Sequence, residues 1–268
     1  MKEYDNSEKT ARLMLDDYVK SVTNELGDSI EGIILLGSLV YGGYIPGPGD
    51  IDQITILKND AAEEIEQQVL ALIKSTMGKY NNAVNIATTI YRKSQLERPW
   101  QTEYDCTPES KHLVTVPEEL LRIHDHGQVI WGNIDVSSLP KPTIDEMKEY
   151  HLRWRKWNEI FFAQSPEHKK MIESPPLRIA VASIISMAIW HYYYATGKTC
   201  FNKHKISGLL KSAVHNYRYL DILETATNVR RAAFQNIADN IQKQIINGFF
   251  AMYGWYVQHD IGEIPITK

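Results

Sequence analysis

The sequence predicts an α+β fold in which a mixed helix-and-strand part is followed by a C-terminal helical bundle. Helical and strand patterns alternate over residues 7–91. After the proline-containing stretch at residues 137–145, strand patterns nearly disappear and long helical patterns replace them. With 268 residues, 43% of them hydrophobic and 23% charged, the chain has a globular composition and room for two domains. We expect domains at residues 1–139 and 140–268.

The first half is predicted to alternate between helices and strands. Residues 7–26 place apolar side chains at helical spacing, and Gly27 is a plausible stop. The predicted helices are residues 7–26 and 60–77, and the predicted strands are residues 33–36, 51–57 and 84–91. The Gly- and Pro-rich residues 41–50 cannot form a regular element.

The second half is predicted to be helical. Asp145 and Glu146 fall in the first turn of its first helix, where acidic side chains favour the helix dipole. The predicted helices are residues 143–163, 177–196, 203–217, 220–226 and 232–258. Before them, His124 and His126 stand two residues apart, which we interpret as a turn, with a metal pair on a strand as the alternative.

Composition excludes several classes of protein. The net charge of −4 argues against a surface that coats nucleic acid. The two cysteines, Cys106 and Cys200, have no metal-like spacing and indicate a reducing compartment rather than a disulfide framework. The N-terminus lacks an apolar signal core, and no apolar run reaches membrane-spanning length. We therefore expect a cytoplasmic protein without a membrane or nucleic-acid partner.

Asp50 and Asp52 form the strongest candidate site in the sequence. On a strand, residues two apart project from the same face, so both carboxylates reach one place. Such a pair repels itself unless a cation lies between, and Mg²⁺ prefers oxygen ligands of this kind. Upstream, Gly37 lets a phosphate approach the backbone, and Ser38 adds a hydroxyl and an amide. Each feature alone is common in turns, but their combination predicts a phosphate-plus-metal site.

The segment GIILLGSLVYGGYIPGPGDIDQITIL resembles the signature of the DNA polymerase β-like nucleotidyltransferase superfamily. That signature is an apolar strand, Gly-Ser, a short spacer and Asp-x-Asp in the next strand. A helical second domain is similar to that of the aminoglycoside adenylyltransferases of the streptomycin/spectinomycin and kanamycin types. The resemblance implies a nucleotidyltransferase domain with a small mixed sheet flanked by helices, followed by a helical acceptor-binding domain.

The same resemblance implies roles for several residues. Gly37 and Ser38 would hold the triphosphate, and Asp50 and Asp52 would hold magnesium, with two ions expected. The segment WHYYYATGKTCFNKHK looks like a phosphate-contacting stretch of the spectinomycin-type enzymes. It suggests Lys198 and Lys203, with Lys205 a near alternative. The Lys156–Trp157 pair resembles the kanamycin-type layout and suggests Lys156 as a further nucleotide contact.

A third carboxylate, expected from the resemblance, is missing from its usual positions. Asn85 stands where the spectinomycin-type enzymes carry an acid, and asparagine cannot accept a proton. Leu152 stands at the kanamycin-type position. The nearest acids on that predicted helix are Glu146 and Glu149, and Glu149 is the better candidate for the general base. A solvated helix face is the alternative interpretation for both.

The resemblance implies a magnesium-dependent enzyme that moves AMP from ATP onto a hydroxyl of a small, aminoglycoside-like molecule. Two alternatives remain: an enzyme that nucleotidylates a protein, as in toxin–antitoxin pairs, and a nucleotide-binding module without activity. A homodimer is expected only from the resemblance.

Overall fold

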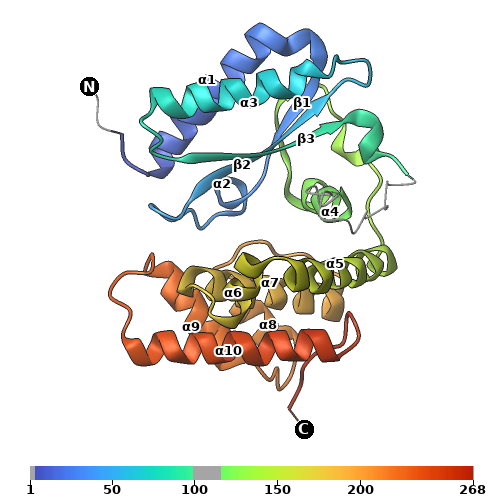
Figure 1. Cartoon of the computed structure of the whole chain (residues 1–268). Helices are drawn as coiled ribbons and strands as arrows, with labels where there is room; N and C mark the ends of the chain where they lie inside the picture. Colours follow the sequence, from blue (N-terminus) through green and yellow to red (C-terminus); the bar gives the residue numbers. More distant parts are fainter. Residues whose placement is uncertain (1–3, 99–115, 268) are drawn as a thin grey trace. The chain divides into compact units, whose positions relative to one another are not determined.

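The computed structural model describes residues 4–98 and 116–267, which form two compact units. The first unit comprises residues 4–98 and 116–142, and the second comprises residues 143–267. Cys106 lies outside the described residues. Figure 1 shows the ribbon coloured from the N-terminus to the C-terminus.

The first unit is built on a mixed sheet of four strands within the described residues. Its helices are α1 (Glu8–Leu26), α2 (Ser38–Tyr41), α3 (Glu64–Lys79) and α4 (Val116–His126), and its strands are β1 (Ile30–Leu35), β2 (Asp50–Leu57), β3 (Asn85–Arg92) and β4 (Gln128–Gly132). The strand order is β3-β2-β1-β4. The β1 strand runs antiparallel to β2 and β4, whereas β2 and β3 are parallel and are joined through α3. This arrangement confirms the predicted small mixed sheet.

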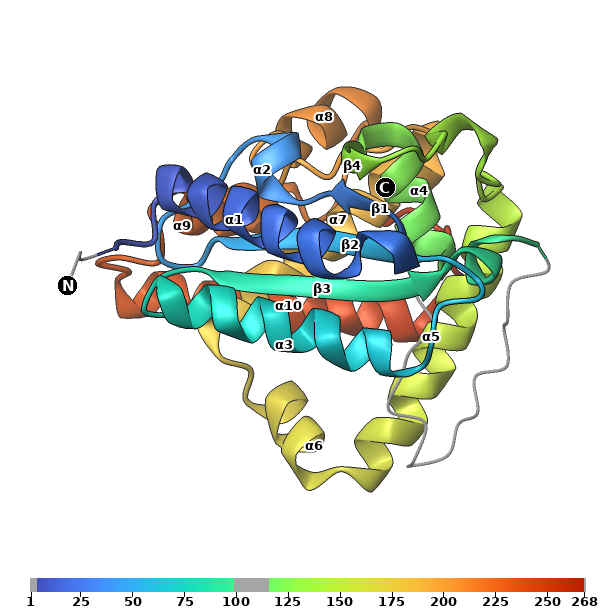
Figure 2. The ribbon, with the colours of Figure 1, turned by 90° about the horizontal axis from the view of Figure 1, so that it is seen from above.

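Helices α1 and α3 cover one face of this sheet (Figures 1 and 2). The first begins where the sequence predicts, because the Ser7 hydroxyl accepts a hydrogen bond from the Thr10 amide at 3.3 Å. Its buried side chains join the core with those of β1, β2 and β3, including Ile33, Ile51 and Ile86. Burial of Ile51 fixes the register of β2, so Asp50 and Asp52 must project from the opposite face.

Helix α4 lies on that opposite face (Figure 1). A Cβ atom on Gly127, the residue after α4, would lie 3.1 Å from Ile34 Cγ2 of β1, which shows how closely the end of this helix approaches the sheet. Leu120, Leu121 and Ile123 of α4 are fully buried. The hydrophobic contact between α4 and the sheet therefore lies on the same face as the two aspartates.

The structure corrects the sequence-based prediction for residues 116–132. This stretch is helix α4 followed by the short strand β4, and neither element was predicted. His124 and His126 lie in the last turn of α4 rather than in a turn or on a strand. Two helical residues that are two apart point in different directions, which excludes a shared metal pair here.

The second unit consists of helices in its described residues. They are α5 (Ile144–Gln164), α6 (Pro166–Glu173), α7 (Leu177–Thr196), α8 (Ile206–Ala213), α9 (Leu220–Arg231) and α10 (Asp239–Gln258). The apolar helix α7 contacts α8, α9 and α10 and forms the centre of the bundle. Gly248 lets α10 approach α9, since a Cβ there would lie 2.1 Å from Ile222 Cγ1. In the described residues, no helix has the length and apolar character needed to cross a membrane.

The predicted fold class, a mixed α/β part followed by a helical part, is thus confirmed. The predicted helix at residues 232–258 starts later, at Asp239, because Ala233, Phe234 and Asn236 adopt positive φ angles that no helix contains.

Candidate nucleotide and metal site

The Gly37–Ser38 turn lies directly after β1 and opens the short helix α2. Gly37 has φ 71° and ψ −161°, a combination that is essentially confined to glycine. Its carbonyl accepts hydrogen bonds from the amides of Val40 and Tyr41, at 3.1 and 2.9 Å. The turn is therefore a fixed structure that depends on glycine at this position.

Asp52 lies against the bare Cα of Gly37. A Cβ atom built on Gly37 would lie 1.9 Å from Asp52 Oδ2, so any side chain there would displace the carboxylate. The backbone adds a second link, because the Leu36 amide donates to the Asp52 carbonyl at 2.9 Å. The structure thus brings the predicted phosphate turn and one predicted metal ligand into direct contact.

Asp50 is the first residue of β2 and precedes Asp52 on the same face of the strand. Both side chains are partly exposed, whereas Ile51 between them is fully buried. The four residues Gly37, Ser38, Asp50 and Asp52 therefore belong to one unit and to two adjacent segments of it, as the sequence predicts.

The neighbouring strand β3 does not supply a third carboxylate. In the parallel register, Asp50 pairs with Asn85 and Asp52 pairs with Ala87. The strand reads NIATTIYR and contains no acidic residue. Across the described residues, no group of three His, Cys, Asp or Glu side chains is placed to hold a metal ion.

These residues fit magnesium that arrives with a nucleotide rather than an ion held by protein alone. Mg²⁺ commonly takes one or two carboxylates from the protein and completes its shell with water and substrate phosphates. Asp50 and Asp52 provide such a pair, and the glycine at position 37 lets the Asp52 carboxylate lie directly against the Gly-Ser turn. The donor set is therefore compatible with magnesium bound together with a triphosphate.

A charged cluster on α4 was not identified from the sequence. Glu118 forms an ion pair with Arg122 one turn later. Burial raises the pKa of Glu119 to about 7, with the negative charges of Glu118 and Asp52 adding to the effect and Arg122 opposing it. Glu119 is thus electrostatically coupled to the candidate metal ligand. Recognition of the helix at residues 116–126 could have revealed Glu119 from the sequence. That helix packs its apolar side on the face of the sheet that carries the two aspartates.

The remaining predicted site residues lie in the second unit. Lys156 is exposed on α5, Lys198 is exposed directly after α7, and Lys203 is exposed in the turn before α8, as is the alternative Lys205. Glu149 lies on α5 and forms an exposed ion pair with Arg153. Their participation in the site stays a prediction.

Glu146, the second acid considered as a base, has a structural function. Its carboxylate accepts hydrogen bonds from the Thr143 amide at 2.7 Å and the Thr143 hydroxyl at 3.0 Å. The Glu146 amide in turn donates to the Thr143 hydroxyl at 3.2 Å. This reciprocal capping box starts α5 and occupies Glu146.

The described residues thus combine a mixed sheet, a Gly-Ser turn beside paired aspartates and a helical unit. The chain is similar to a solved structure, spectinomycin adenyltransferase AAD(9) from Enterococcus faecialis with ATP and spectinomycin. The TM-score is 0.62, and the match covers 91% of this chain and 99% of that one at 14% sequence identity. A scan against protein-family models gives no match, and a sequence search of curated proteins gives none either. The similarity therefore shows the fold.

Proposed function

We propose that this protein transfers AMP from ATP to a hydroxyl group of a small, aminoglycoside-like molecule. The observation that carries the proposal is the contact between Asp52 and the bare Cα of Gly37, with Asp50 on the same strand face. This arrangement offers a phosphate site and two metal ligands side by side. The structural neighbour was solved with ATP and spectinomycin, which supports ATP as the donor and a small molecule as the acceptor.

Each residue of the first unit has a defined task in this proposal. Gly37 admits a phosphate to the backbone, and Ser38 donates hydrogen bonds to it. Asp50 and Asp52 would hold magnesium, which would neutralise charge on the triphosphate and assist the departure of pyrophosphate. The acceptor oxygen then bonds to the α-phosphorus as the bond to the leaving pyrophosphate breaks, and the hydroxyl proton passes to a nearby base.

The aspartate pair is assigned to magnesium, and β3 carries no acid. The base must therefore come from another element. Glu149 is the candidate that the sequence suggests. Glu119 is a second candidate, because it lies on α4, which covers the face of the sheet that carries Asp52, and because burial raises its pKa to about 7. Lys156, Lys198 and Lys203 are proposed as triphosphate contacts from the helical unit, where a positive charge favours the polyphosphate.

The test is pyrophosphate release with ATP and Mg²⁺ in the presence of spectinomycin and a panel of aminoglycosides and lincosamides. We expect release that depends on one class of acceptor and falls at least about 100-fold in Asp52→Asn, which removes one ligand charge. An unchanged rate in Asp52→Asn would reject the metal site.

A nucleotide-binding module without activity is the second candidate function. The absence of an acid on β3 favours it, since Asn85 stands where the third carboxylate is expected and pairs with Asp50. It predicts tight binding of magnesium–ATP without pyrophosphate release for any acceptor. The two candidate functions therefore differ in one measurement, the release of pyrophosphate.

A further inference from the structure

The segment that leads into α1 is bound to the loop between the Gly-Ser turn and β2. The side-chain oxygen of Asn6 accepts hydrogen bonds from the Tyr44 hydroxyl at 2.8 Å and the Gly47 amide at 3.0 Å. The side-chain amide of Asn6 donates to the carbonyls of Gly47 and Gly49, both at 3.3 Å. One side chain thus fixes three residues of a loop that has no regular structure of its own.

This loop ends directly before Asp50 and therefore affects the position of that residue. Gly49 is the residue before Asp50, and its amide donates to the Ile45 carbonyl at 2.8 Å. The Tyr44 ring lies on Gly49, since a Cβ there would be 2.7 Å from the ring. Burial raises the pKa of Tyr44 to about 12, and the charge of Asp50 adds to the shift.

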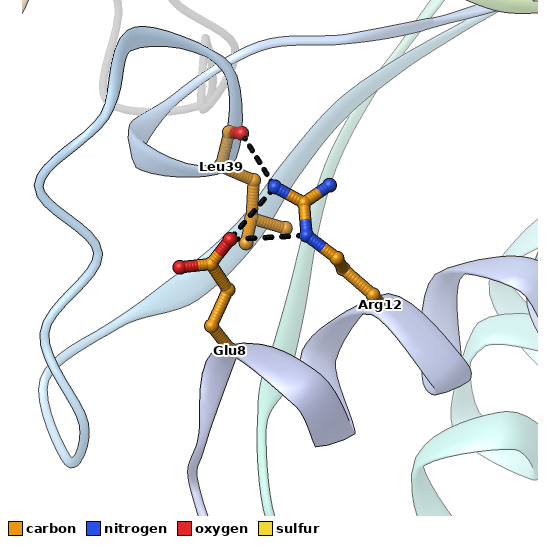
Figure 3. A network of polar contacts seen from close by, with 3 residues as sticks. All are labelled: Glu8, Arg12 and Leu39. Atoms are coloured by element: carbon orange, nitrogen blue, oxygen red, sulfur yellow. Dashed lines mark hydrogen bonds and ion pairs between the residues drawn. The ribbon is translucent and has the colours of Figure 1, made fainter.

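A second contact joins the same end of α1 to α2, the short helix that the Gly37–Ser38 turn opens (Figure 3). Arg12 donates from Nη2 to the Leu39 carbonyl of α2 at 3.1 Å. The guanidinium group is oriented by Glu8 one turn earlier, with Nε and Nη2 at 3.0 and 2.7 Å from Glu8 Oε1. Leu39 follows Ser38 directly, so Arg12 contacts the residue next to the Gly37–Ser38 turn.

We propose that Asn6 and Arg12 are positioning residues that hold the loop before Asp50 and the Gly37–Ser38 turn at a fixed separation. The inference rests on the proposed function, because it assigns metal binding to Asp50 and phosphate binding to the turn. The two anchors, Asn6 and Arg12, belong to one stretch of seven residues at the start of α1. The loop between the Gly37–Ser38 turn and β2, in contrast, is rich in glycine and proline. Asn6 acts on the metal ligand, and Arg12 acts on the phosphate turn.

The two anchors can be separated by measuring ATP affinity with Mg²⁺ and with EDTA, using calorimetry. Asn6→Asp keeps the acceptor oxygen but loses both amide donors, and we expect the affinity gained from Mg²⁺ to fall at least about tenfold, with little change in EDTA. Arg12→Lys loses the fork that joins Glu8 and Leu39, and we expect affinity to fall about three- to tenfold in both conditions. A general loss of stability would not lower the affinity of one variant with Mg²⁺ alone and that of the other in both conditions.

Hydrogen exchange gives a readout that does not depend on nucleotide. In Asn6→Asp, amides of residues 42–50 should exchange faster, while those of α3 should not change. Asn240→Asp, at an exposed position of α10, and Arg231→Lys, at another exposed arginine that donates to a backbone carbonyl, are matched controls expected to behave as wild type. Should Asn6→Asp fail to fold, Tyr44→Phe removes one bond to Asn6 and should give a smaller effect of the same sign.

Unchanged Mg²⁺-dependent affinity and unchanged exchange in Asn6→Asp would overturn the inference. Failure of the wild type to bind ATP would instead contradict the proposed function, and the exchange rates would still decide whether Asn6 orders the loop.

Discussion

At the scale of single residues, the site depends on the absence of a side chain at position 37. The bare Cα of Gly37 is what allows the Asp52 carboxylate to lie against the turn. The sequence pattern predicted that these residues share a site, because Gly-Ser after a strand and Asp-x-Asp on the next strand have fixed geometric consequences. It did not predict the direct contact, which depends on how β1 and β2 pair.

Gly37→Ala is predicted to abolish magnesium–ATP binding and to lower pyrophosphate release at least about 100-fold, because the new methyl group would displace Asp52. The backbone conformation adds a cost in folding free energy of about 1–3 kcal/mol. Gly78→Ala on α3, where an added Cβ meets nothing within 4 Å, is the control and should keep wild-type binding. Calorimetry and thermal melting measure both effects, and normal ATP binding by Gly37→Ala would contradict this account of the turn.

Glu119 is predicted to make stability depend on pH. Its pKa is raised from 4.5 to about 7 in the folded protein, so between these values the folded state holds a proton that the unfolded state releases. The free energy of unfolding should therefore fall as pH rises from about 4.5 to 7. The slope should correspond to about one proton more on the folded than on the unfolded state. Urea midpoints across this range should lose that slope in Glu119→Gln and keep it in Glu66→Gln, at an exposed position of α3. Equal slopes in both variants would refute the assignment.

At the scale of elements, α1 and β2 are joined by a buried polar network below the site. The Tyr18 hydroxyl lies 3.0 Å from Thr55 Oγ1 and accepts from Gln53 Nε2 at 3.2 Å, and Gln53 Nε2 also donates to Thr88 Oγ1 at 2.5 Å. Gln53 and Thr55 are buried on the strand that carries the two aspartates. The network therefore fixes the register of β2 from the opposite face.

Tyr18→Phe is predicted to lower the free energy of unfolding by about 1–3 kcal/mol, because it leaves buried polar partners without the hydroxyl. Chemical denaturation measures the change, with Tyr4→Phe at a half-buried ring as the comparison. A loss no greater than that of Tyr4→Phe would show that the network does not contribute to stability.

Glu146 and Glu149, both on α5, should have different functions. Glu146→Ala removes the capping box and should cost about 0.5–2 kcal/mol of stability, with activity kept. Glu149→Gln should leave the melting temperature nearly unchanged and, if Glu149 is the base, lower kcat about 10²–10⁴-fold. Full activity in Glu149→Gln would reject Glu149 as the base.

Elements with a strong internal pattern could be predicted from the sequence, and short or edge elements could not. The apolar run before Gly37 and the β-branched run after Asp50 correspond to β1 and β2. In contrast, α4 was missed although Leu120, Leu121 and Ile123 follow a helical pattern over its 11 residues, and β4 was missed because an edge strand of 5 residues carries little periodicity. Glu119 was missed with them, since its importance depends on tertiary packing.

At the scale of the whole molecule, the match to spectinomycin adenyltransferase AAD(9) extends along 91% of the chain at only 14% identity. Fold is therefore retained where most side chains differ, and chemistry must be argued from the site. The Gly-Ser turn and the aspartate pair are present, whereas β3 carries no acid. Activity thus depends on whether another acid supplies the base.

Mass spectrometry of the acceptor tests the central claim most directly. Wild-type protein incubated with ATP, Mg²⁺ and spectinomycin or another member of the aminoglycoside panel should convert one acceptor into an AMP adduct, with one pyrophosphate released per adduct. Asp52→Asn should form the adduct at least about 100-fold more slowly. Binding of magnesium–ATP by the wild type without an adduct on any acceptor would contradict the account.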